Sequence, residues 1–281
     1  MKNIFIPLLA TLCFFFSPSR DGYAQMLSSN DSQLWNGKEC AVVLSYDDAI
    51  VEHLTNVIPA LDAVGLKGTF YLNAIGTAYI GDYINDWREA AKNGHELGNH
   101  TMVHPCAGNK SNTSWVNEQN DNDLNTYSLK RIVDDIRGHN ALLKAIDGRD
   151  ERTFAYPCGD NMVSGNINYF DVVKDYFVAA RAVQTGMVII DEIDFANIPC
   201  FNIQMQPAEY MIDLIEKAAR KNALIVFMYH GVGGGHDLNA SLEEHNKLLN
   251  YLKENKNRIW TSTFLDAAKN AKAYKNKINI K

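Results

Sequence analysis

The feature that most constrains this chain is an alternation of short apolar segments with amphipathic ones, repeated along most of its 281 residues. The apolar segments have the length and composition of buried strands, and residues 41–46 and 223–229 are two clear examples. The segments between them have helical periodicity, as in residues 128–146, where apolar side chains fall on one side. Repeated strand–helix units place parallel strands in one sheet, so we expect an α/β fold.

The length of the repeating region favours closure of this sheet, because it is large for a sandwich but suits one α/β barrel. We therefore predict a single distorted (β/α) barrel with a mostly parallel, closed or nearly closed sheet. Strands are expected at residues 41–46, 67–72, 96–99, 152–156, 177–181, 198–203, 223–229 and 258–261. Helices are expected at residues 55–63, 86–93, 128–146, 207–221, 242–255 and 264–273. An open doubly wound sheet is the alternative, since periodicity does not show whether a sheet closes.

The start of the chain has the layout of a secretory signal peptide. A positive first stretch is followed by the apolar run 4–16, and Gly22 and Ala24 supply small residues before the expected cleavage point. The apolar run is too short to span a membrane. A lipoprotein anchored through Cys13 is the alternative, although the residues before Cys13 fit that signal poorly.

We therefore expect a signal peptide (1–24), a loose polar arm (25–38) and one folded domain (39–281). The folded part contains no apolar stretch of spanning length. The formal net charge is −6 and the chain has no basic run, so we expect no nucleic-acid partner. These features predict a monomer that is secreted or periplasmic after cleavage.

Four cysteines lie beyond the signal peptide, namely Cys40, Cys106, Cys158 and Cys200, and an oxidising compartment would permit disulfides. Cys40 precedes its expected strand, whereas Cys106 and Cys158 follow theirs, so Cys40 should lie at the opposite end of the barrel. Two cysteines can bridge only when their Cα atoms come within about 7 Å. We therefore predict that Cys40 pairs with neither, and that Cys106 and Cys158, if bridged, bridge each other.

Reactive side chains follow several of the expected strands. In a parallel barrel the carboxyl ends of the strands meet on one face, and active sites are built there. We therefore expect these side chains to gather in one site. They are Asp47, Asp48, His100, His104, Cys158, Arg181 and His230.

His100 and His104 are four residues apart, which places two imidazoles on one side of a helical turn. Such a pair can share one divalent ion, and a carboxylate from the pair Asp47 and Asp48 can complete a three-residue ligand set with open positions. Histidines at this spacing are often ordinary surface residues, but the acidic pair on the same face favours a metal site. Zinc suits two imidazoles and a carboxylate, and cobalt, nickel and manganese are alternatives.

These motifs resemble those of the NodB-homology polysaccharide deacetylases, also called carbohydrate esterase family 4, across about residues 39–265. Residues 45–49 (Ser-Tyr-Asp-Asp-Ala) are similar to the family motif Thr-Phe-Asp-Asp-Gly. Residues 100–104 keep its His-Ser/Thr-x-x-His motif, and residues 228–230 resemble its Leu-x-His motif. The resemblance implies a (β/α) barrel that hydrolyses acetyl groups on an acetylated oligo- or polysaccharide.

The resemblance also implies a role for each matching residue. Asp48, His100 and His104 would bind the metal ion. Asp47 would be the general base that takes a proton from water, and His230 would be the general acid that protonates the leaving group.

The family motif Arg-Pro-Pro-Tyr-Gly aligns with residues 155–159, where Ala155 replaces the arginine and Cys158 replaces the aromatic residue. The backbone N–H of Cys158 can still donate to an oxyanion. A guanidinium beside a carboxylate keeps it ionised, and we hypothesise that Arg181 replaces the missing arginine and contacts Asp47. The alternative is an ordinary surface arginine. We find no counterpart of the family's Asp-x-x-Asp-Trp motif near Arg181.

The sequence leaves the substrate open. The acetyl group removed can belong to an amide, as in chitin-like or peptidoglycan sugars, or to an ester, as in acetylated xylan. A non-catalytic carbohydrate-binding protein that has kept the metal is a third possibility, favoured by Ala155 but not by the intact Asp47 and His230. The loop around Trp115 is either a sugar-contacting rim or merely solvated, and the glycine-rich residues 231–235 are interpreted as a flexible rim loop.

Overall fold

The computed structural model of this chain describes residues 34–108, 110, 113–116, 121–164 and 167–279. The predicted signal peptide, the alternative anchor at Cys13 and most of the predicted arm lie outside the described residues. Among the helices that are described, none combines the length and the apolar character that a membrane span requires.

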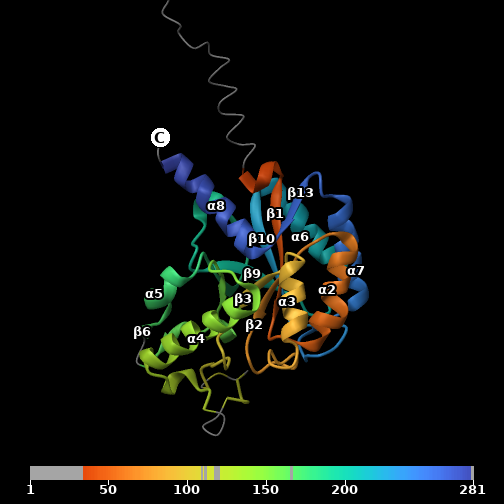
Figure 1. Cartoon of the computed structure of the whole chain (residues 1–281). Helices are drawn as coiled ribbons and strands as arrows, with labels where there is room; N and C mark the ends of the chain where they lie inside the picture. The colour runs from red at the N-terminus through yellow and green to blue at the C-terminus, as the bar shows by residue number, and fades with distance from the viewer. Residues whose placement is uncertain (1–33, 109, 111–112, 117–120, 165–166, 280–281) are drawn as a thin grey trace, which may run out of the picture.

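Seven parallel strands form the barrel shown in Figure 1. In order around the barrel they are β1 (Cys40–Asp47), β2 (Thr69–Leu72), β3 (Glu96–Asn99), β4 (Phe154–Ala155), β7 (Ala180–Thr185), β9 (Ile198–Asn202) and β10 (Ala223–Tyr229). The barrel closes because β10 pairs with β1 over six residue pairs, from Ala41 with Leu224 to Tyr46 with Tyr229. The predicted closed sheet is thus confirmed, and the open doubly wound alternative is wrong.

Two further strands extend this sheet without entering the ring. β13 (Ile259–Ser262) pairs with the first half of β1, whereas β2 pairs with its second half. β8 (Met187–Ile189) runs antiparallel to the start of β10 and was not predicted. Two short pairs, β5 (Met162–Val163) with β6 (Ile167–Asn168) and β11 (Gly231–Val232) with β12 (Asn239–Ala240), lie in loops.

Helices follow the strands and pack outside the barrel, with α2, α6 and α7 on one side of β1 and β10 in Figure 1. The α-helices are α2 (Ile58–Val64), α3 (Ile84–Lys92), α4 (Leu129–Asp147), α5 (Phe170–Val173), α6 (Ala208–Lys221), α7 (Leu242–Glu254) and α8 (Phe264–Asn279). A π-helical turn (His53–Val57) leads into α2. Short 3-10 turns lie at Leu34–Gly37, Leu124–Thr126, Pro157–Gly159, Lys174–Tyr176 and Ile190–Glu192.

Several predicted boundaries were wrong by a few residues. The helical segment before α2 begins ahead of Thr55, whose hydroxyl donates to the carbonyl of Val51 instead of capping a helix. Pro207 precedes the first residue of α6 instead of being it. The strand predicted at residues 177–181 lies at Ala180–Thr185, and α8 continues to Asn279.

The interior and exterior of the barrel are both apolar, which explains the continuous apolar run of β1. Ala41 and Val43 belong to a core cluster inside the barrel, and Val42 and Leu44 belong to the cluster beneath the helices. Because side chains alternate along a strand, the same period points Asp47 toward the interior. The carboxyl end of β1 thus carries a charge into the barrel.

The residues just before β1 close the opposite end of the barrel. Leu34 and Trp35 are buried against α8, and the indole N–H of Trp35 donates to the carbonyl of Asn222 at 2.8 Å. The last part of the predicted loose arm is therefore packed, because one large aromatic side chain there fills the end of the barrel.

Candidate metal and hydrolytic site

The carboxyl ends of the barrel strands open into one cavity of about 680 Å³. Six of the seven residues that the sequence singled out line this cavity, namely Asp47, Asp48, His100, His104, Cys158 and His230. The seventh, Arg181, is fully buried beside it. The expected convergence on one face therefore occurs.

The carboxylate of Asp48 lies between two pairs of imidazoles. Its Oδ1 is 3.5 Å from His100 Nε2 and 3.3 Å from His104 Nε2. Its Oδ2 is 3.8 Å from His230 Nε2 and 3.9 Å from His236 Nε2. Burial by itself raises the pKa of Asp48, but the imidazoles outweigh burial and hold the pKa well below its usual range. Asp48 is therefore ionised at neutral pH.

His100 is held in the form that can bind a metal ion. Its Nδ1 donates to the carbonyl oxygen of Ala155 at 2.8 Å, which leaves the lone pair on Nε2 facing Asp48. Burial lowers the pKa of His100 to about 4, so the ring is neutral at pH 7. The backbone carbonyl of Ala155 thus orients His100, although the side chain of Ala155 cannot do what an arginine would do.

The segment that carries the two histidines is an irregular loop, and the predicted helical turn is wrong. Thr101 and His104 have φ of 61° and 49°, in the left-handed region that non-glycine residues rarely adopt. The loop is held by the Asn99 side chain, which accepts from Thr101 N at 2.7 Å, and by Asp135, which accepts from Met102 N at 2.7 Å. These contacts bring the two rings to a centroid distance of 4.7 Å.

Asp135 gives this loop a pH-dependent contribution to stability. Burial raises the pKa of Asp135 to about 6, above its value in the unfolded chain. Its contribution to the free energy of unfolding therefore falls as pH rises from about 4 to about 6 and stays low above that.

Asp135→Asn should keep an acceptor for Met102 N while removing the buried charge. We expect this variant to be about 1–3 kcal/mol more stable than the parent at pH 7, with the difference vanishing near pH 4. Urea unfolding at both pH values checks this. An equal difference at pH 4 and pH 7 would show that ionisation of Asp135 is not the cause.

Arg181 contacts Asp47, as hypothesised from the sequence. Its Nη2 donates to Asp47 Oδ2, and its guanidinium lies 5.2 Å from the centre of the Tyr71 ring. Burial lowers the pKa of Arg181, but the charge of Asp47 together with the nearby Cys200 and Tyr71 outweighs burial and raises the pKa above the usual value for arginine. Arg181 is the second residue of β7, not the last of its strand, and it reaches the site because its side chain points into the barrel.

Asp47 has one oxygen held and one oxygen available. Oδ2 accepts from Arg181, whereas Oδ1 is buried with no hydrogen-bond partner in the described part of the chain. A buried carboxylate oxygen normally has a partner. Oδ1 is therefore the atom that can accept a proton or a hydrogen bond from a molecule in the cavity.

The sequence analysis missed His236. Its ring stacks on His230 with centroids 4.9 Å apart, and its Nδ1 accepts from Leu238 N at 2.9 Å. Nε2 of the neutral ring therefore carries the hydrogen and faces Asp48. A histidine six residues after His230, across a glycine-rich loop, was the signal that could have revealed it.

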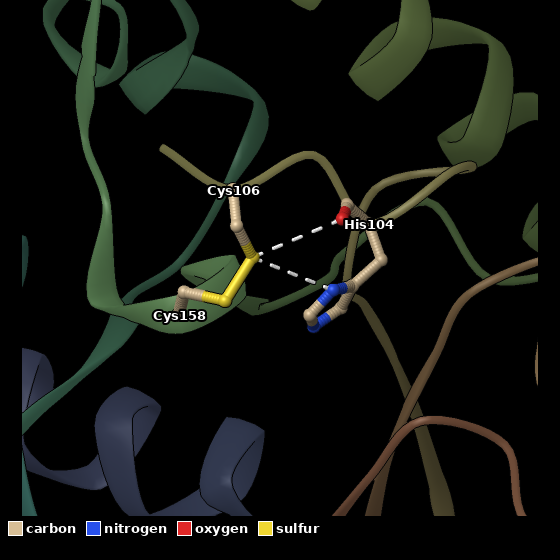
Figure 2. A group of neighbouring side chains, drawn as sticks. All are labelled: His104, Cys106 and Cys158. Atoms are coloured by element: carbon tan, nitrogen blue, oxygen red, sulfur yellow. Dashed lines mark hydrogen bonds between the residues drawn. A yellow bond between two sulfur atoms is a disulfide. The ribbon is translucent and has the colours of Figure 1, made fainter. Parts of the chain in front are cut away.

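A disulfide joins Cys106 and Cys158 beside the site, with Cα atoms 5.8 Å apart (Figure 2). Cys40 and Cys200 are free and buried. The predicted pairing is therefore confirmed. Cys106 Sγ lies 3.6 Å from His104 Nδ1, so the bridge touches a residue of the expected metal set.

The side chains present fit a single divalent ion. One ligand atom each from Asp48, His100 and His104 lies within 4.8 Å of the other two. An ionised carboxylate and two imidazoles form a donor set typical of catalytic zinc, which leaves a position for water or substrate. Trp115 lies at the rim of the same cavity, 42% exposed, with its ring 5.9 Å from that of His104.

Comparison with known proteins shows what this chain is similar to. Residues 36–170 match the family model described as polysaccharide deacetylase. Among solved structures, the peptidoglycan deacetylase PdaC from Bacillus subtilis is 15% identical, with a TM-score of 0.51 over 86% of this chain and 95% of that one. A mutant of a CE4 family pseudoenzyme from Bacillus anthracis is 18% identical, with a TM-score of 0.50 over 82% of this chain and 67% of that one. At these identities, the likeness of this chain to each of the two structures shows a shared fold and nothing about function.

Two curated relatives match parts of the chain. A gellan lyase from a Bacillus species is 24% identical over 205 residues, which is 73% of this chain. A chitin deacetylase from Arthroderma benhamiae is 33% identical over 63 residues, or 22% of this chain. The chain spans only 7% and 17% of the lengths of these relatives. The match to the family model covers residues 36–170, which include Asp47, Asp48, His100 and His104, so this part of the chain is similar to the polysaccharide deacetylases.

Proposed function

We propose that this protein is a metal-dependent deacetylase that removes acetyl groups from N- or O-acetylated carbohydrate. One observation carries the proposal: the cavity contains both an ionised carboxylate flanked by two imidazoles and a second carboxylate, Asp47, with one oxygen available. A non-catalytic protein that only binds carbohydrate would not need the second carboxylate. The contact of Arg181 with Asp47 supplies the positive charge that Ala155 lacks, which removes the main argument for a non-catalytic role.

Asp48, His100 and His104 would hold the ion, and zinc suits these donors best. When bound, the ion supplies Lewis acidity toward the acetyl carbonyl and toward water. The residues around it divide the remaining tasks between them, and each task follows from the contacts described above.

Asp47 Oδ1 takes a proton from the attacking water, because it is the oxygen without a partner. Arg181 holds Asp47 in place through its contact with Oδ2. The backbone N–H of Cys158, which lines the cavity, donates to the oxyanion as it develops. His230, on the other side of Asp48 from the proposed ligands, protonates the leaving nitrogen or oxygen.

We also propose that the protein acts outside the cytoplasm after removal of residues 1–24, and that it acts as a monomer. The support is the signal-peptide pattern of the sequence and a disulfide beside the site, which an oxidising compartment favours.

Acetate release tests the proposed function. The zinc-loaded protein should release acetate from at least one of three substrates, namely acetylated xylan, chitooligosaccharide and peptidoglycan fragments, and a chelator should stop the release. Release from xylan alone would assign an esterase, and release from an amino sugar would assign an amidase. No release from any of them, by protein with full metal content, would contradict the proposal and favour a carbohydrate-binding role.

A further inference from the structure

His104 faces two different groups with its two ring nitrogens. Nε2 lies 3.3 Å from Asp48 Oδ1, whereas Nδ1 lies 3.6 Å from Cys106 Sγ. Figure 2 shows this second side, where the Cys106–Cys158 disulfide lies against the imidazole. A metal-binding histidine usually donates its second N–H to a carbonyl or carboxylate, as His100 does here. A pair of sulfur atoms in that place is unusual.

The three groups have the spacing of a metal ligand set. Their ligand atoms, one each from His104, Cys106 and Cys158, all lie within 4.8 Å of one another. A thiolate and an imidazole nitrogen on the same tetrahedral zinc ion are about 3.6 Å apart, given bond lengths of about 2.3 and 2.1 Å. The Sγ–Nδ1 distance matches this value. Since thiolates bind metals and a disulfide does not, the set can form only after reduction.

We propose that reduction of the Cys106–Cys158 disulfide opens a second metal site, in which the two thiolates and His104 Nδ1 bind one thiophilic divalent ion such as zinc. A dithiol or phosphine reductant supplies two electrons to the S–S bond, and two protons from water complete the thiols. When the ion binds, the two thiols release these two protons to water.

The cavity gives a reductant access to this disulfide. Cys158 is half-buried and lines the cavity, whereas Cys106 is fully buried behind it. The backbone of Cys106 is anchored, because its N–H donates to Asn122 O and its carbonyl accepts from Leu124 N. Cys158 lies in a short 3-10 turn with φ of 54°, an unfavourable conformation for a residue other than glycine. Cys158 is therefore the partner that can adjust once the bond is broken.

The second site would exclude the proposed catalytic one. A neutral imidazole has a single nitrogen with a free lone pair. An ion at Nδ1 of His104 leaves the hydrogen on Nε2, which then cannot bind an ion shared with Asp48 and His100. The redox state of the disulfide would thus decide which ligand set is complete. This competition rests on the proposed function, whereas the thiolate site does not.

Cobalt(II) can test the thiolate site directly, because a cobalt–thiolate bond produces a charge-transfer band in the near ultraviolet. Protein reduced with a phosphine under argon and given one equivalent of Co²⁺ should show this band. The oxidised protein should not show this band. Because the oxidised protein contains the same free thiols, Cys40 and Cys200, it controls for cobalt binding at those two residues. Cys106→Ser should lose most of the band, and Asp48→Asn, which lacks a proposed catalytic ligand, should keep it.

Two results would overturn the thiolate site, namely no band in the reduced protein and an undiminished band in Cys106→Ser. If Cys106→Ser does not fold, reduced wild-type protein whose thiols have been alkylated takes its place. The alkylated protein should also lack the band. With one equivalent of zinc, reduction should remove most acetate release from the wild type, and unchanged release would overturn the competition. A wild type that never releases acetate would contradict the proposed function, while the cobalt band would still test the thiolate site.

Discussion

Replacing His104 with alanine should abolish both stoichiometric binding of a divalent ion and acetate release. The variant keeps Asp48 and His100, but two protein ligands hold a catalytic ion far more weakly than three. Loss of a residue that merely supports a ligand typically costs 10–100-fold in metal affinity or activity, so loss of a ligand itself should cost more than about 100-fold. Elemental analysis after dialysis measures the metal, and acetate release measures the activity.

His236→Ala is the matched control for this experiment. His236 faces the same carboxylate from 3.9 Å but lies outside the proposed ligand set, so its removal should leave about one ion per chain. A full metal content in His104→Ala would remove His104 from the ligand set. Loss of the metal from both variants, with the fold intact by circular dichroism, would mean that the ion lies nearer to His236 than we propose.

Replacing Arg181 with alanine should affect both stability and catalysis. The pair that it forms with Asp47 is almost completely buried, and removal of one partner from a buried ion pair costs about 3–5 kcal/mol, since the other charge remains unpaired. Turnover should fall because Asp47 loses the group that orients it. The metal content should stay unchanged, because Arg181 is not one of the proposed ligands.

Arg152 offers a matched control for Arg181. It is also buried and pairs with a buried aspartate, Asp147, at 3.0 Å, but neither residue lines the cavity. Arg152→Ala should reduce the free energy of unfolding by a similar amount without lowering the turnover of the folded protein. If Arg181→Ala keeps near-normal turnover, Arg181 does not take the place of the family's arginine.

The barrel strands were predictable from the sequence because both of their faces are buried. Residues 223–229 and 96–99 are observed as strands at the predicted bounds, and β1 is longer than predicted by one residue at each end. In residues 223–229 and 41–44 this burial appears as a continuous apolar run, which the sequence displays directly, whereas residues 96–99 include Glu96 and Asn99 and form no such run. β8 is also apolar but is only three residues long, and only its middle residue is buried, so the prediction missed it.

The irregular parts of the site were harder to predict, because local propensity does not determine them. The turn at His100 to His104 has the spacing of a helix, yet Asn99 and Asp135 hold its backbone in a different conformation. Asp48 and His104 both have positive φ, which no sequence rule would assign to them. Contacts with distant residues stabilise these conformations.

The sequence by itself determined the residue types at the carboxyl ends of the strands, and with them the resemblance to the polysaccharide deacetylases and the expected metal set. The tertiary structure decided how these residues meet. Closure of β10 onto β1 brings His230 next to Asp48, and the return of the glycine-rich loop stacks His236 on it. The inward face of β7 brings Arg181 to Asp47. These contacts join residues that are far apart in the chain. They therefore depend on the register of the strands and on closure of the barrel, which no local sequence pattern encodes.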